Sequence, residues 1–378
     1  MNFDYTDEQN MLRDSIAKWA AGQYDFDKRR EALKNEDAWR TNWATFAELG
    51  LLAAPLPEEF GGLGGGAIDI SVVTEEFGKA LVVEPYVPTV VLGGGALNYG
   101  GNAAQKEEHL NAIAAGERVI AFAQAEPKSR WTLHDVSTSA KKDGAGWVLN
   151  GHKAVVLGAP QADHLLVSAR TGGGQRDAKG ISLFLVPKDA KGISTRDYPT
   201  MDGSRAAEVY FENVSVGAAN LIGEADNALS LIERIVDEAN AAYNHEAVGC
   251  MRMMTSSTQD YAKQRKQFGK AIAEFQVIQH RLVDMFMAAE ESYSMALRAT
   301  IKLADDAERA RAVSAAKVSI GKHGRFVGQA AVQIHGGMGV TDEMRVGHYF
   351  KRVTMLDATF GNIDSHLKRY TALSAKAA

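Results

Sequence analysis

The distribution of proline is the feature of this sequence that most restricts its fold. All eight prolines lie at or before Pro199, so the stretch 200–378 contains none. At a typical proline content of about 5%, a stretch of that length would hold roughly nine. Proline removes a backbone donor and clashes with the preceding helical turn, so its absence favours long, unbroken helices. We therefore predict that the second half of the chain is helical.

Two apolar stripes within this stretch repeat with the 3.6-residue period of an α-helix. The first comprises Ile278, Leu282, Met285, Phe286, Ala289, Tyr293, Ala296 and Leu297, and the second comprises Val313, Ala316, Ile320, Val327, Ala331 and Ile334. Each stripe is long enough for a helix of about 25 residues, which would be nearly 40 Å long. Three or four such helices packed antiparallel form a bundle. We expect this bundle from about residue 226 onward.

Helical periodicity also begins near the N-terminus, where Thr6 and Gln9 have the spacing of a capping box. Helical segments extend to about residue 117, and glycine clusters at 61–66 and 93–95 interrupt them. Neither cluster has the form of a GxGxxG motif after a strand or of a P-loop, so turns between helices are the favoured interpretation.

Between about residues 118 and 222 the pattern changes to short apolar runs separated by Gly, Asp, Asn and Pro, which is typical of β-strands. The runs cover 119–123, 147–149, 154–157, 164–169, 181–186 and 208–211. The segments GAGW at 144–147 and GGGQRDAKG at 172–180 resemble hairpin connections. The predicted fold class is therefore α+β, with a helical domain at 1–117, a β-domain at 118–225 and a helical bundle at 226–378.

Composition excludes several classes of protein. Hydrophobic residues make up 46% and charged residues 24%, which is typical of a globular chain, and the net charge of −5 offers no basic surface for nucleic acid. The single cysteine, Cys250, cannot form an internal disulfide, which favours a reducing compartment. The chain contains no apolar run long enough to span a bilayer and no visible secretory signal. We expect a soluble, cytoplasmic protein that spans no membrane.

Common catalytic motifs are missing. The histidines do not form an HxxxH pair with an acidic partner, and one cysteine cannot build a thiolate cluster, so no metal site is expected. The sequence also lacks a GxSxG nucleophile elbow and a phosphate loop with lysine.

Two motifs in the second half combine residues that could contact a ligand. The segment YAKQRKQFG at 261–269, followed by Phe275 and Gln276, places basic side chains beside an aromatic ring and a glycine. The segment QIHGGMGV at 333–340 interrupts a helical run with three glycines. Guanidinium groups suit phosphate, and glycines allow a close backbone approach. Taken singly, the motifs are also compatible with a solvated basic turn and a helix–helix turn.

Together, these motifs resemble the pattern of the acyl-CoA dehydrogenase family: YAxxRxQFG, then FQ, then QxxGGxG further along the chain. Other landmarks are DYTDEQNMLRDS near the N-terminus, PEEFGGLG at 57–64, EEFGKAL at 75–81 and GWVLNGHKAVV at 146–156. The resemblance covers the whole chain. It implies an N-terminal helical domain, a β-barrel-like middle domain and a C-terminal four-helix bundle. It also implies α,β-desaturation of an acyl-CoA, FAD bound between subunits, and an electron-transfer flavoprotein as acceptor.

The resemblance also implies roles for individual residues. Arg265 and Phe268 would contact the FAD of a neighbouring subunit, with Gln276 close by, and Gln333 and Gly337 would line the adenosine side. In the β-domain, the residues facing the isoalloxazine would be Phe122, Gln124 and Ala125, with Val155 to Leu157 covering its other side through backbone contacts.

The family's catalytic glutamate is missing from both of its known positions. In most members it follows the QxxGGxG motif, and the corresponding position here, counted from Gln333, holds Phe360. In others it precedes the YAxxR motif on the first bundle helix, and that position, counted back from Arg265, holds Ala239. Neither side chain can accept a proton. The flavin loop, usually TEPGSGSD, also departs from the family pattern because it carries Lys128, Arg130 and Trp131.

Three hypotheses account for the missing base. The base could have moved to Glu246, two helical turns beyond Ala239 on roughly the same face. Alternatively, the chain could be the subunit without a base in a heterotetramer with a larger subunit, because Phe-Gly at 360–361 and HYFKR at 348–352 resemble small subunits of pimeloyl-CoA and steroid side-chain dehydrogenases. The third hypothesis is a non-catalytic binding or structural role. A homo-oligomer and a related flavin oxidase or monooxygenase also stay open.

Overall fold

The computed structural model describes residues 4–377, which form two compact units. The helical unit contains the residues up to 36, residues 67–82 and the residues from 240 onward. The sheet unit contains residues 37–66 and 83–239. The long helix α7 (Leu229–Gln264) belongs to the sheet unit as far as Ala239 and to the helical unit from Asn240.

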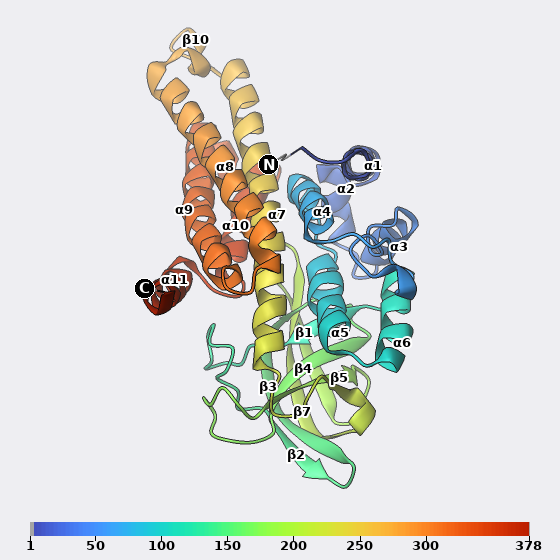
Figure 1. Ribbon diagram of the computed structural model, residues 1–378. Coiled ribbons are helices and arrows are strands. Elements are labelled where there is room, and N and C mark those ends of the chain that lie inside the picture. Colours follow the sequence, from blue (N-terminus) through green and yellow to red (C-terminus); the bar gives the residue numbers. More distant parts are fainter. Residues whose placement is uncertain (1–3, 378) are drawn as a thin grey trace. The chain divides into compact units, whose positions relative to one another are not determined.

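In the helical unit, α9 is the central element and packs against α8, α10 and α11 (Figure 1). The helices of this unit are α1 (Asp7–Gln23), α2 (Phe26–Ala32), α4 (Ala67–Ala80), the greater part of α7, α8 (Gln276–Ile301), α9 (Arg309–His335), α10 (Arg345–Ala358) and α11 (Ile363–Ala377). The short strands β9 (Lys266–Gln267) and β10 (Lys270–Ala271) form a ribbon between α7 and α8. The long helices predicted from the missing prolines are therefore confirmed, with the first apolar stripe on α8 and the second on α9.

The sheet unit is built around an eight-stranded sheet. Seven strands follow the order β6-β7-β3-β2-β4-β5-β8, and β1 pairs in parallel with β4. The strands are β1 (Ile120–Ala123), β2 (Ser139–Asp143), β3 (Gly146–Leu157), β4 (His164–Arg170), β5 (Ile181–Pro187), β6 (Ile193–Pro199), β7 (Arg205–Val216) and β8 (Leu221–Ile222). The longer helices of this unit are α3 (Trp39–Glu48), a π-helical segment (Val87–Gly93), α5 (Gly94–Gly100), α6 (Ala103–Ala114) and the first part of α7.

The α+β fold class and several local predictions are confirmed. Thr6 and Gln9 exchange the two hydrogen bonds of a capping box at the start of α1. The predicted segment 144–147 contains the two-residue connection 144–145 and the start of β3, and residues 172–180 lie between β4 and β5, so both predicted hairpins form. The exact domain bounds at residues 117 and 225 stay predictions.

Two predictions need correction. The runs 147–149 and 154–157 belong to one strand, β3, because the polar residues between them continue the pairing with β7. The cluster Gly93–Gly95 forms no turn; it continues a helix. Glycine is required there by packing, since a Cβ at Gly93 would lie only 2.8 Å from the Cβ of Ile120. The strands β2 and β6 were not predicted because their exposed, polar residues carry little apolar signal.

Two glycines bring α4 and α7 into backbone contact within the helical unit. A Cβ at Gly78 would lie 2.0 Å from the carbonyl oxygen of Glu246, and one at Gly249 would lie 2.1 Å from that of Glu75. A methyl group cannot be accommodated at either distance unless the helices separate.

We expect Gly78→Ala or Gly249→Ala to lower the free energy of unfolding by about 1–3 kcal/mol or more, because the added methyl overpacks the α4–α7 contact. The matched control is Gly22→Ala on α1, where nothing beyond the adjacent backbone of its own helix lies within 4 Å of the added Cβ. That substitution should raise stability by about 0.5–1 kcal/mol through helix propensity. Urea unfolding followed by circular dichroism measures all three, and equal effects at the three positions would contradict the expectation.

Candidate active site

The motif at 261–269 lies at the end of α7 and in the ribbon that follows it. Phe268 has a left-handed backbone with φ of +51° and is 92% exposed, and its ring makes an edge-on contact with Phe275 at 6.2 Å between ring centroids. Arg265 is exposed, and no residue in the described part of the chain forms an ion pair or side-chain hydrogen bond with it. Gln276, the first residue of α8, is also exposed. These three side chains are accessible to a ligand or another subunit.

The second motif lies next to the first. The Tyr261 ring stacks on the His335 ring at 4.3 Å, and the Tyr261 hydroxyl donates to the His335 carbonyl oxygen at 3.4 Å. Directly after His335, α9 ends at Gly336, whose φ is +61°. Gln333 and Gly337 are exposed on either side of this helix end. The structure thus brings the two motifs together at neighbouring helix ends.

The residues predicted to face the isoalloxazine lie on two adjacent segments of the sheet unit. Phe122 and Gln124 are buried at the end of β1 and just after it, and Ala125 follows. The Ala154 amide donates to the Ala125 carbonyl oxygen at 2.8 Å, which joins this segment to β3. Beyond it, Val155 is 50% exposed and Leu157 is half-buried. Lys128, Arg130 and Trp131, in the loop expected to contact the flavin, are exposed.

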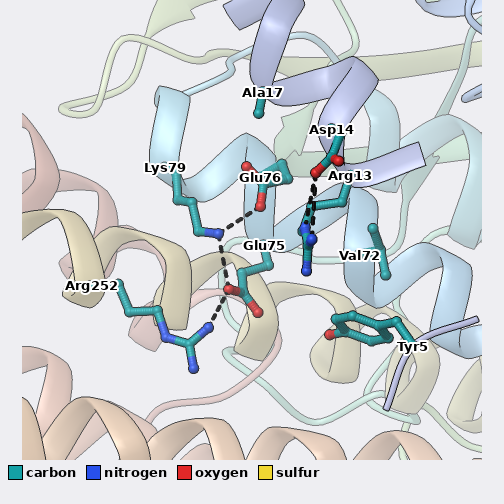
Figure 2. Close-up of a pocket in the computed structure, with 9 residues that line it drawn as sticks. All are labelled: Tyr5, Arg13, Asp14, Ala17, Val72, Glu75, Glu76, Lys79 and Arg252. Atoms are coloured by element: carbon teal, nitrogen blue, oxygen red, sulfur yellow. Dashed lines mark hydrogen bonds and ion pairs between the residues drawn. The ribbon is translucent and has the colours of Figure 1, made fainter. Parts of the chain in front are cut away.

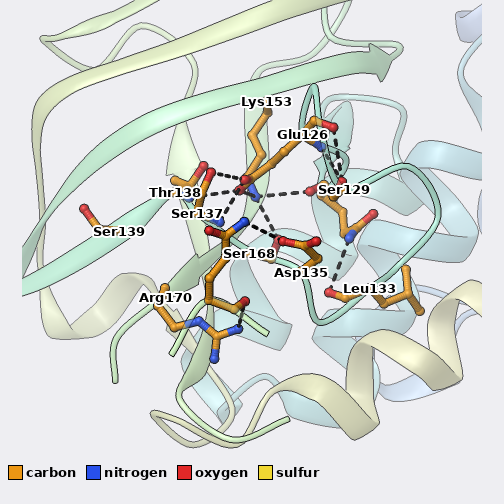
Figure 3. Close-up of polar contacts among 12 residues, drawn as sticks. Glu126, Ser129, Leu133, Asp135, Ser137, Thr138, Ser139, Lys153, Ser168 and Arg170 are labelled. Carbon is orange, nitrogen blue, oxygen red and sulfur yellow. Dashed lines mark hydrogen bonds and ion pairs between the residues drawn. The ribbon is translucent and has the colours of Figure 1, made fainter. Parts of the chain in front are cut away.

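Sequence reasoning missed a buried ion pair beneath these segments (Figure 3). The Lys153 ammonium is fully buried and lies 2.8 Å from a carboxylate oxygen of Glu126. Burial opposes the charged carboxylate, but Lys153 and hydrogen bonds from Ser137 and Thr138 together hold the pKa of Glu126 down at about 2. Two sequence features could have indicated this pair. Lys153 occupies an inward position of an alternating strand, and Glu126 is the glutamate of the Ala-Glu-Pro segment.

The two positions that usually hold the base are apolar. Ala239 is fully buried on α7, and one turn later Tyr243 stacks on Phe360 with 6.4 Å between ring centroids. Phe360 has a φ of +52° in the turn between α10 and α11. The turn that carries Phe360 therefore packs against the part of α7 that directly follows Ala239.

The backbone of this turn is held by two buried side chains. The Lys317 ammonium donates to the carbonyl oxygens of Leu356 at 2.7 Å and Thr359 at 3.0 Å, and burial lowers its pKa to about 8. The His366 Nε2 lies 3.1 Å from the Phe360 carbonyl oxygen, and its Nδ1 lies 3.3 Å from the Ser314 hydroxyl. Burial, with Lys317 and Arg369 nearby, lowers the pKa of His366 to about 3.

We expect His366 to make the chain less stable in acid. Its pKa is depressed in the folded state from 6.5 to about 3, so between these pH values the unfolded chain binds more protons and stability falls as pH falls. At pH 5 the loss is about 2 kcal/mol. His366→Gln should remove this part of the pH dependence, as measured by urea unfolding from pH 7 to pH 4.5. A parallel decline in the variant and the original chain would exclude His366 as the cause.

Glu246 is buried in the helical unit, with only 4% of its surface exposed. The Arg352 Nε of α10 donates to its Oε1 at 2.6 Å, and Arg352 is itself largely buried. One carboxylate oxygen of Glu246 is therefore occupied by an ion pair between α7 and α10.

A separate cavity of about 380 Å³ lies in the helical unit (Figure 2). It is lined by Tyr5, Arg13, Asp14, Ala17, Val72, Glu75, Glu76, Lys79 and Arg252. Lys79 pairs with Glu76 at 2.6 Å, and Arg252 pairs with Glu75 at 2.5 Å. The Arg252–Glu75 pair joins α4 to α7. Because three cations and three carboxylates line the cavity, their charges balance and favour no charged ligand.

Over residues 4–377, no helix is long and apolar enough to cross a membrane.

Comparisons with known proteins agree with this architecture. Models described as the N-terminal, middle and C-terminal domains of acyl-CoA dehydrogenase match residues 6–117, 121–214 and 229–372. A probable acyl-CoA dehydrogenase, YngJ of Bacillus subtilis (strain 168), is 32% identical over 368 residues, which cover 94% of this chain and 95% of that protein.

Two solved structures have the same fold over nearly the whole chain. A variant of the steroid ACAD Tcur3481-Tcur3483 is 28% identical with a TM-score of 0.88, covering 98% of both chains. The ChsE4-ChsE5 complex from Mycobacterium tuberculosis is 24% identical with a TM-score of 0.90, covering 100% of this chain and 99% of that chain. The chain therefore belongs to the acyl-CoA dehydrogenase family of FAD-dependent oxidoreductases.

Proposed function

We propose that this chain is one subunit of a heteromeric acyl-CoA dehydrogenase and that a larger homologous subunit supplies the catalytic glutamate. The observation that carries the proposal is the apolar character of both base positions, Ala239 and Phe360, with the Tyr243 ring against Phe360. A methyl group and an aromatic ring cannot remove the α-proton of an acyl-CoA. The steroid ACAD Tcur3481-Tcur3483, which is named as a pair of proteins, supports a heteromer.

The residues proposed to hold FAD fit such a ligand. The exposed Phe268 ring offers a stacking face, and the exposed guanidinium of Arg265, three residues earlier in the chain, is suited to a phosphate. The exposed Gly337 leaves room for a close approach, with nothing within 4 Å of an added Cβ. In the sheet unit, Val155 is half-exposed. Each of these groups is available because the chain's own packing does not cover it.

We assign the following roles to this chain. Arg265, Phe268 and Gln276 would bind the FAD of a neighbouring subunit, and Gln333 and Gly337 would line its adenosine side. The segments with Phe122, Gln124 and Ala125 and with Val155 to Leu157 would orient the isoalloxazine. Bound FAD supplies the acceptor for the hydride that leaves the β-carbon of the acyl-CoA. An electron-transfer flavoprotein would then take the electrons, and we place the complex in the cytoplasm.

Co-expression tests this proposal. The chain purified alone should carry FAD but show little bleaching of its flavin absorbance with butyryl-CoA, octanoyl-CoA or a steroid side-chain acyl-CoA. Co-purification with a larger acyl-CoA dehydrogenase that retains its glutamate should restore bleaching. Rapid bleaching by the isolated homo-oligomer would contradict the proposal, and absence of flavin in both preparations would favour a non-catalytic subunit.

The alternative of a self-sufficient enzyme with a relocated base has one observation in its favour. Glu246 is buried on the same helix as Ala239, two turns further along. If Glu246 is the base, Glu246→Gln should abolish flavin reduction in the isolated chain while FAD is retained. Oxygen consumption by the reduced flavin would instead indicate an oxidase or monooxygenase.

A further inference from the structure

Val155 is a strained residue in the sheet unit. Its φ is +51°, a left-handed conformation that is rare for a β-branched side chain. It lies where the register between β3 and β7 shifts, between Lys153 and Val156. Such a conformation costs about 1–3 kcal/mol and persists only where surrounding contacts enforce it. The half-exposed Val155 side chain does not supply those contacts, so they must come from its neighbours.

Lys153 supplies such contacts on one face of β3. Its ammonium is fully buried and donates to the Gln124 carbonyl oxygen at 3.1 Å, to Glu126 Oε1 at 2.8 Å and to the Ser168 hydroxyl at 3.1 Å. All three protons of the ammonium group are therefore used. Their acceptors lie on the segment after β1 and on β4, so Lys153 fixes β3 against both.

Glu126 extends the same network (Figure 3). Its Oε1 also accepts from the Thr138 amide at 3.0 Å, and its Oε2 accepts from the amide of Ser137 at 2.8 Å and from the Ser137 hydroxyl. The ion pair thus holds together residues 124–126, residues 137–138 and β3.

Glu208 holds the opposite face of the strand. The Val155 amide donates to its Oε1 at 3.4 Å, the Tyr198 hydroxyl donates to Oε1 at 2.9 Å, and the His152 ring lies 2.6 Å from Oε2. Successive side chains of a strand point to opposite faces, so His152 and Lys153 hold the bulge from both sides. The strained backbone at Val155 is therefore fixed before any ligand binds.

We infer that Lys153 and Glu126 are positioning residues that hold the segments 122–125 and 154–157 at a fixed separation, so that both can contact the isoalloxazine of FAD. The inference rests on the proposed contact of these segments with FAD. The hydrogen bond from the Ala154 amide to the Ala125 carbonyl oxygen joins the two segments directly beside the ion pair. Preorganised contact groups bind better because no ordering is needed at the moment of binding.

The test uses the double variant Lys153→Met/Glu126→Gln, because removing both charges of a buried pair destabilises far less than removing one. Compared with the original chain, we expect FAD to bind at least tenfold more weakly, and the visible circular dichroism of the bound flavin to change. The control is Ser182→Ala, which removes a buried hydroxyl that contacts Thr171 and the Asp226 amide elsewhere in the sheet. The control should leave FAD affinity within twofold.

Amide hydrogen exchange of the FAD-free chains separates this inference from the proposed function. In the double variant, exchange at 154–157 should accelerate at least tenfold, while β5 exchanges as before. Unchanged exchange at 154–157, or unchanged FAD affinity and flavin dichroism, would overturn the inference. If the original chain binds no FAD, the FAD contact proposed for these segments fails, and the inference that depends on it fails too; the exchange data then show only whether the pair holds the bulge.

Discussion

Replacing Phe360 by glutamate should give the isolated chain acyl-CoA-dependent reduction of its flavin. The substitution restores a carboxylate at the position where most family members carry the base. General-base catalysis contributes about 10²–10⁴-fold in rate, so bleaching by a suitable acyl-CoA should accelerate by that factor. Stopped-flow absorbance at the flavin band measures the rate with the same panel of acyl-CoA thioesters used for the original chain.

The structure explains why this substitution should preserve the local backbone. Phe360 already has a φ of +52°, and the steric penalty there is no larger for glutamate than for phenylalanine. Lys317 holds the carbonyl oxygens of Leu356 and Thr359, and His366 holds that of Phe360, so the turn is fixed without the aromatic side chain. The substitution removes the stacking of Phe360 on Tyr243.

Phe360→Gln is the matched control because glutamine has nearly the same shape as glutamate but cannot act as a base. Both variants should bind FAD equally, and only the glutamate variant should bleach. If the flavin of the original chain and of both variants bleaches rapidly and at the same rate, a base already exists elsewhere. The proposal of a subunit without a base then fails. Flavin bleaching that appears in Phe360→Glu and is lost again when the pH falls below the carboxylate pKa would support the proposed role.

The sequence predicts features that depend on local patterns. The long helices follow from the missing prolines and the 3.6-residue period, and the hairpins at 144–147 and 172–180 follow from their glycines. The two motifs proposed to bind a ligand could also be located, because each lies within a short segment at a helix end. Their contact through Tyr261 and His335 could not, since the two residues lie 74 positions apart.

Other features of the candidate site depend on long-range packing that one sequence does not encode visibly. In the sequence, Lys153 looks like an ordinary polar residue of a strand. In the structure it is fully buried, and its ammonium group donates to three acceptors. The left-handed backbone of Val155 contradicts the preference of valine for extended strands, so a local rule predicts the opposite. Stacking of Tyr243 on Phe360 likewise requires the helix and the turn to be packed first.

Removing Arg352 should destabilise the helical unit more than any surface substitution. Arg352→Met takes away the cation that lies 2.6 Å from the buried Glu246 carboxylate, and breaking such a pair costs about 3–5 kcal/mol. The double variant Glu246→Gln/Arg352→Met removes both charges and should recover most of that loss. Lys34→Met is the control, because the ion pair of Lys34 and Glu31 is exposed to solvent and its loss should change stability little.

The same variants distinguish a structural Glu246 from a catalytic one. Urea unfolding of the original chain, the two single variants and the double variant gives the coupling between Glu246 and Arg352, which we expect to exceed about 2 kcal/mol. In the assembled heteromer, the double variant should retain flavin reduction by acyl-CoA, because an ion pair that only joins α7 to α10 takes no part in proton transfer. Alternatively, the double variant could fold and bind FAD but fail to reduce it. That result would identify Glu246 as the base, because the Glu246 carboxylate is the only proton acceptor that the two substitutions remove.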